Sequence, residues 1–144
     1  MEKNQKKSSV LTAVSSLAQF RKMRKELVEG IYLELPESGL TVKVARPSLE
    51  DLIENDKLPR ALIPAAMKIR AKDATPEDLR EVVKVTNLIV MSSIKEPKVV
   101  LNSPKDDEIT LDSIPINDRN YIYSYVERGN DFLELYSKVK QRKR

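Results

Sequence analysis

The chain has 144 residues, of which 40% are hydrophobic, and it contains no cysteine, histidine or tryptophan. The length suits one domain, the lack of cysteine excludes disulfides and thiolate metal sites, and the lack of histidine removes the commonest metal ligand and general base. No apolar run approaches the roughly 20 residues of a membrane span, and the mixed polarity of residues 10–19 argues against a secretory signal.

The net charge of +4 is unevenly distributed. Residues 1–28 carry seven bases and two acids, and residues 138–144 carry five bases and no acid. The remaining residues, 29–137, carry fourteen bases and twenty acids, and such an acidic body repels phosphate. We therefore expect a basic amphipathic N-terminal arm (1–28), a single core domain (29–137) and a disordered basic tail (138–144).

The arm predicts a helix from Ser8 or Ser9 to about Glu29, which Gly30 is placed to end. Apolar residues recur along it at helical spacing: Val10, Leu11, Val14, Leu17, Met23 and Leu27. A basic amphipathic helix can lie on a membrane, but a stripe with the single aromatic Phe20 is more typical of packing against protein.

Residues 31–46 predict a β-hairpin. Apolar residues alternate along 31–35 and again along 40–44, as in half-buried strands. Between these runs, Pro36 restricts φ and Gly39 accepts a positive φ, which favours a tight turn.

Two short helices are expected next. Ser48 is a good N-cap, with Asp51 three residues later. Pro59 and Pro64 prevent one continuous helix through this segment. We expect a second short helix over 65–71.

A longer helix is expected to begin at Thr75-Pro76, because threonine caps a helix and proline suits its first position. The run Leu79–Ile94 then predicts the central buried helix, although its valine content leaves a strand open. Lys95-Glu96-Pro97 breaks the helix, and short strands are expected near 99–101 and 109–111.

The C-terminal helix is expected to begin at Asn117, with Ile116 and Tyr121 forming a hydrophobic staple and Gly129 interrupting it. Together these elements predict an α+β fold, in which a small antiparallel sheet built on hairpin 31–46 packs against helices 76–94 and 118–127.

No group of residues indicates catalysis. The acidic run 106–108 lacks the spacing of a calcium loop, and the acids at 50–56 are placed to cap and solvate a short helix. The three glycines are not clustered, so no phosphate-binding loop is present. We expect a non-enzymatic protein with no catalytic, cofactor or metal site.

Four features, taken in order, resemble the tail assembly chaperones of long-tailed bacteriophages. They are the turn Leu35-Pro36-Glu37-Ser38-Gly39 with its strands, Arg46-Pro47 leading to Leu52-Ile53, the segment Lys57-Leu58-Pro59-Arg60-Ala61-Leu62, and Glu96-Pro97-Lys98-Val99-Val100 followed by Ile114-Pro115-Ile116-Asn117-Asp118-Arg119. The resemblance covers roughly residues 31–136. Glu37 is an extra residue in the turn, and Asp56 and Arg60 stand where the family has glycine and asparagine.

The resemblance implies a chaperone-like protein that binds a tape-measure or other tail protein, such as the tail-tube protein, in the host cytoplasm during tail morphogenesis. The candidate partner-binding residues are Val10, Val14, Leu17 and Leu27 on the arm, and Arg60 and Leu62. The sequence leaves open whether the protein forms a homo-oligomer.

Two other functions stay open at this point. One is a structural component of the virion tail, neck or baseplate, and the other is a small nucleic-acid-binding regulator, which the acidic body disfavours.

Overall fold

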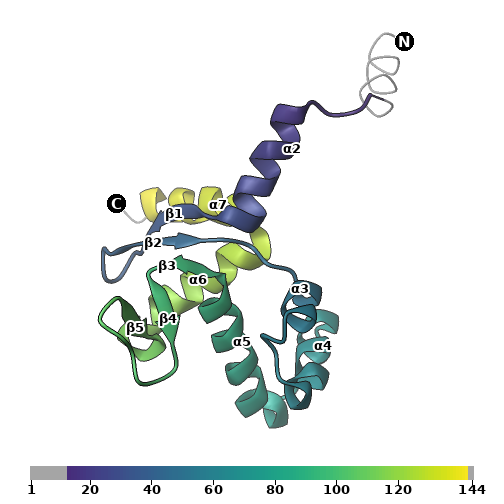
Figure 1. The fold of residues 1–144 in the computed structure, drawn as a ribbon, viewed down its shortest axis with the longest axis vertical. Coiled ribbons are helices and arrows are strands. Elements are labelled where there is room, and N and C mark those ends of the chain that lie inside the picture. The colour runs from purple at the N-terminus through teal and green to yellow at the C-terminus, as the bar shows by residue number, and fades with distance from the viewer. Residues whose placement is uncertain (1–12, 143–144) are drawn as a thin grey trace.

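The computed structural model of the chain describes residues 13–142, with side chains described through Lys140. It confirms the α+β class, with helices surrounding a small sheet (Figure 1). The helices are α2 (Leu17–Arg24), α3 (Leu49–Glu54), α4 (Ile63–Ala71), α5 (Leu79–Ser93), α6 (Ile116–Arg128) and α7 (Asn130–Arg142). The strands are β1 (Ile31–Glu34), β2 (Thr41–Val44), β3 (Ile94–Glu96), β4 (Lys98–Val100) and β5 (Glu108–Thr110).

The predicted hairpin is present. β1 and β2 are antiparallel, with Leu33 opposite Val42. Both of these side chains are buried while Tyr32 is exposed, as the alternation predicts. At the turn, Gly39 has φ +74° and donates its N–H to the carbonyl oxygen of Leu35 at 2.9 Å.

β3 was not predicted, because the sequence places a helix end and a break over its residues. It follows α5 directly and pairs antiparallel with β2, with Glu96 opposite Lys43. β4 and β5 form a separate parallel pair, in which Lys98 lies opposite Glu108 and their charged groups are 3.3 Å apart. The short strands expected near 99–101 and 109–111 are therefore confirmed, each beginning and ending one residue earlier.

The core has two clusters, and α5 contributes to both. Val90 packs in the cluster formed by the sheet, α6 and the 111–114 turn, and Val85 packs in the cluster formed by α3, α4 and α5. The helix is central, as expected, but its first turns face solvent. Leu79 is 63% exposed and Val83 is 46% exposed, so the expectation that the run Leu79–Ile94 is buried is wrong at these two positions.

Local capping follows the sequence at two helices. Ser48 and Asp51 exchange side-chain-to-backbone hydrogen bonds at the start of α3, at 3.1 Å each. Before α5, the Asp78 carboxylate accepts the Thr75 N–H at 2.9 Å, and Pro76–Asp78 forms a 3₁₀ turn.

The predicted start of α6 is wrong. The helix begins at Ile116 behind Pro115, so Asn117 is not its cap, and Ile116 is 55% exposed and forms no staple. Tyr121 packs instead against α7, with its ring centroid 5.1 Å from that of Phe132. The next helix, α7, therefore makes the contact with Tyr121 that the sequence pattern assigned to Ile116.

Gly129, at φ +65°, separates α6 from α7 as predicted. α7 continues through Arg142, so the expected disordered tail is helical over 138–142.

The N-terminal helix begins later than predicted. Residues 13–16 are not helical, and positions 8–12 of the predicted helix lie outside the described residues. Ser16 caps α2 by accepting the N–H of Gln19 at 3.2 Å, and the Gln19 side chain accepts the N–H of Ser16 at 2.7 Å. The helix ends in a π-helical turn over Lys25–Glu29, followed by Gly30 at φ +96°.

Candidate protein-docking surface

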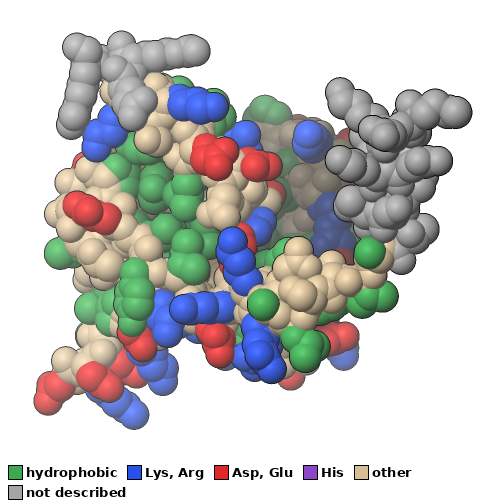
Figure 2. Space-filling model, turned by 90° about the horizontal axis from the view of Figure 1, so that it is seen from above, with side chains coloured by type: hydrophobic (Ala, Val, Ile, Leu, Met, Phe, Trp, Pro, Cys, Tyr) green, Lys and Arg blue, Asp and Glu red, His purple; other side chains and the backbone are tan. Residues whose placement is uncertain are grey.

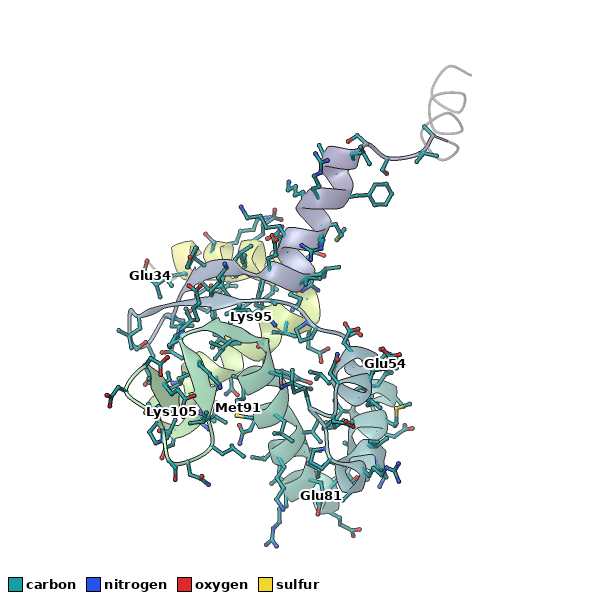
Figure 3. All side chains as sticks on the ribbon, viewed as in Figure 1. Glu34, Glu54, Glu81, Met91, Lys95 and Lys105 are labelled. Carbon is teal, nitrogen blue, oxygen red and sulfur yellow. The ribbon has the colours of Figure 1, made fainter. Side chains whose placement is uncertain are left out.

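α2 stands away from the rest of the described chain. It rises from the sheet on the side opposite the hairpin turn, with α3, α4 and α5 on the lower part of the body (Figure 1). Every residue of α2 is exposed, and the upper turns of the helix stand clear of the other elements in the view of Figure 3. This part of the arm is therefore a projecting helix, and its base decides its direction.

Arg46, just after β2, fixes the base of the arm. Its Nη1 lies 3.2 Å from the Glu26 carboxylate, and its backbone N–H donates to the carbonyl oxygen of Leu27 at 3.0 Å. Its Nε donates to the carbonyl oxygen of Val126 at 3.1 Å, and Nη2 donates to that of Glu127 at 3.4 Å. One half-buried guanidinium thus joins the arm to the carboxyl end of α6, where a cation is favoured.

The surroundings of Arg46 are closely packed. Its guanidinium carbon lies 5.8 Å from the centroid of the buried Tyr125 ring. Burial raises the pKa of Tyr125 to about 12; the Glu26 charge adds to this rise and the Arg46 charge opposes it. Gly129 has φ +65° and ψ −142°, a conformation that favours glycine, and a Cβ atom there would also lie 2.6 Å from Nη1, so Arg46 would have to move. The arm is held by a site with little room to rearrange.

Apolar side chains on the arm are unusually exposed. The exposed fraction is 89% at Val14, 70% at Leu17, 58% at Phe20 and 54% at Met23. Leu17, Phe20 and Met23 follow one another at three-residue spacing, which places them along one side of the helix. Adjacent exposed apolar side chains of this kind mark interaction surfaces.

The same helix is strongly basic. Its exposed cations are Arg21, Lys22, Arg24 and Lys25, and no acid occurs between positions 17 and 25. Arg24 forms an exposed ion pair with Glu29 at 3.0 Å. Arg24 lies four residues after Phe20 and seven after Leu17, so it falls on the same side of the helix as these apolar residues. Apolar and basic side chains therefore lie next to one another on the arm.

The structure separates the six sequence-based candidates. Val14 and Leu17 lie on the exposed arm, whereas Leu27 is half-buried at its base. Arg60 is exposed in a 3₁₀ turn before α4, but Leu62 packs against the second core cluster. Val10 lies outside the described residues.

Phe20 and Met23 were not among these candidates, although both are exposed on the arm. Their three-residue spacing from Leu17 is the sequence signal that could have identified them.

An aromatic groove lies between the hairpin turn, α6 and α7. It encloses about 260 Å³ and is lined by Pro36, Asn117, Asn120, Tyr121, Ser124, Phe132 and Tyr136. The Tyr121 ring makes edge-to-face contacts with Phe132 and Tyr136, at centroid distances of 5.1 and 5.0 Å. Seen from above, hydrophobic side chains gather on the left half of the face shown in Figure 2.

A second cleft, of about 320 Å³, lies between α3, α4, α5 and α6. Leu52, Ile69 and Val126 contribute apolar walls. At its edge, Arg70 donates to the Glu50 carboxylate at 2.5 Å, and this hydrogen bond lowers the pKa of Glu50 to about 2. Arg70 is therefore already paired with an acid, and a second cation, Lys72, also lines the cleft.

Within the described residues, no three acidic side chains come together as metal ligands would, and no helix has the length and apolar character to cross a membrane. The chain matches no protein-family model, no curated protein and no solved structure.

Proposed function

We propose that this is a non-catalytic binding protein that uses the projecting arm to hold a partner protein. The observation that carries the proposal is the row Leu17, Phe20 and Met23, which is exposed on a helix whose base is fixed by Arg46. An eight-residue helix is marginal in water by itself, so a covering partner would stabilise it as well as bury its apolar atoms.

The partner we propose is a helical protein of a phage tail, in the manner of a tail assembly chaperone. Three features support this partner: the motifs over 31–136, which follow the same order along the chain as in that family, the acidic body, and the basic, apolar arm. A chaperone of this kind would act in the host cytoplasm and keep the apolar face of a tape-measure helix covered until assembly.

The test is co-expression with the tape-measure protein encoded by the same phage. Serine replaces Leu17, Phe20 and Met23 together, and the soluble fraction of the tape-measure protein is measured. We expect it to fall at least several-fold relative to the wild type. Deleting all of 1–28 is a poorer experiment, because it removes Glu26 and so unpairs Arg46.

The matched control replaces two equally exposed apolar residues elsewhere, Leu79→Ser and Leu101→Ser, which are 63% and 60% exposed. The control should keep the tape-measure protein soluble. A tape-measure protein that is as soluble with the arm variant as with the wild type would refute the proposal. Retention of the protein in purified particles would favour the structural-component function instead.

A further inference from the structure

The arm and the aromatic groove belong to one chain but point in different directions. We propose that the groove lined by Tyr121, Phe132 and Tyr136 binds α2 of a second copy of this protein, so that copies associate when no other partner is bound. The inference rests on the proposed function in taking α2 as a docking element, and it adds a second surface, the groove, and its occupant.

The arm cannot reach its own groove while its base is intact. Arg46 joins Glu26 to the end of α6, and the Leu27 carbonyl oxygen is bonded to the same residue. The groove begins at Pro36 in the hairpin turn, and α2 leaves the sheet on the opposite side (Figure 1). The two surfaces can therefore meet only between copies.

The apolar parts of the two surfaces are complementary in kind. Phe20 and Met23 are exposed on the arm, and the groove presents the edges and faces of three aromatic rings. Aromatic rings pair favourably at offset or edge-to-face geometry, and a methionine sulfur makes favourable contacts with a ring. One contact would therefore remove apolar area of both surfaces from water.

The charges select this pairing over arm against arm. Residues 17–25 carry four cations and no acid, so two arms side by side would repel each other. The groove lining contains no charged residue. Next to lining residues in the sequence are two exposed acids, Glu37 and Asp131, and one half-buried base, Arg119, whose Nε already donates to the Ile114 carbonyl oxygen. A basic apolar helix thus meets an aromatic groove with acidic edges.

If two copies exchange arms reciprocally, the contact closes into a dimer with two identical interfaces. Each copy then supplies one arm and one groove. A tape-measure helix that binds α2 would compete with this exchange, which links self-association to the proposed function.

The test is a charge exchange measured by sedimentation velocity over a range of protein concentrations at low salt. The groove variant is Glu37→Lys with Asp131→Lys, and the arm variant is Arg21→Glu with Lys22→Glu. Each variant alone should raise the dissociation constant of self-association at least about tenfold. An equimolar mixture of the two should associate as mixed pairs, because each reversed arm then faces a reversed groove.

The variant Phe20→Ser checks the apolar part without touching the core, since Phe20 is exposed, and it should also weaken self-association. A wild-type protein that stays monomeric, or self-association unchanged in both charge variants, would overturn the inference. The groove variant leaves α2 intact, so it should still keep the tape-measure protein soluble. Loss of self-association and loss of that capture are therefore separate results.

Discussion

Replacing Asp118 by alanine should release the hairpin turn from α6. The Asp118 carboxylate is fully buried and accepts the backbone N–H groups of Glu37 at 2.8 Å and Ser38 at 3.0 Å. It lies in the first turn of α6, where a negative charge is favoured by the helix dipole. One side chain therefore joins residues about 80 positions apart.

The magnitude follows from those two bonds. A hydrogen bond to a charged group contributes about 1.5–3 kcal/mol, and a buried amide left without a partner costs a similar amount. We expect Asp118→Ala to lower the free energy of unfolding by about 3–5 kcal/mol, and Asp118→Asn, which keeps one acceptor oxygen, by about 1.5–3 kcal/mol. At about 3 °C per kcal/mol, the alanine variant should melt about 10 °C lower.

Urea unfolding followed by circular dichroism measures this difference, with Asp107→Ala as the control because Asp107 is an exposed acid on the loop between β4 and β5. The control should be within about 0.5 kcal/mol of the wild type. An Asp118→Ala variant that loses less than about 1 kcal/mol, or an asparagine variant as unstable as the alanine one, would refute the reasoning.

Three further outcomes are expected. Val85→Asp should lower the free energy of unfolding by several kcal/mol, because Val85 is fully buried. Val83→Asp should change it by less than about 1 kcal/mol, because Val83 is 46% exposed. Equal losses of the two variants in denaturant unfolding would contradict an α5 with one buried and one exposed side. Gly30→Ala should destabilise the protein more than Gly39→Ala, because a Cβ at Gly30 would lie 2.9 Å from the β2 backbone and one at Gly39 has nothing within 4 Å. In thermal melting, the Gly30 variant should have the lower melting temperature, and the reverse order would contradict this packing. Deleting residues 138–144 should shift the melting temperature by less than about 3 °C, since residues 138–140 are exposed; a larger drop would show that the end of α7 is docked.

The sequence alone determined the features that depend on neighbouring residues. Alternation over 31–44, with Gly39 at the turn, gives the hairpin. The pair Ser48 and Asp51 gives the start of α3, and Gly129 gives the break after α6. Each is fixed by interactions within about one turn of chain, where side-chain type and spacing suffice.

The N-terminal arm differs from what its apolar spacing predicts. Helical spacing suggested one long helix from Ser8 or Ser9, whereas in the described part α2 begins only after Ser16. Exposure also divided the candidates: Leu17 is on a free face, and Leu62 is packed against a core cluster. An apolar pattern identifies a face that needs covering, but the rest of the fold decides whether that face is already covered.

Only the tertiary structure decided the contacts between distant segments. Nothing local requires residues 94–96 to pair with β2, or β4 to run parallel to β5. In the sequence, Asp118 belongs to the motif 114–119 and Arg46 ends the predicted hairpin, and neither pattern indicates a partner; the fold places both side chains against backbone groups about 80 residues away. A polar side chain can satisfy any donor or acceptor within reach, so its partner is set by which chain segment the packing brings beside it.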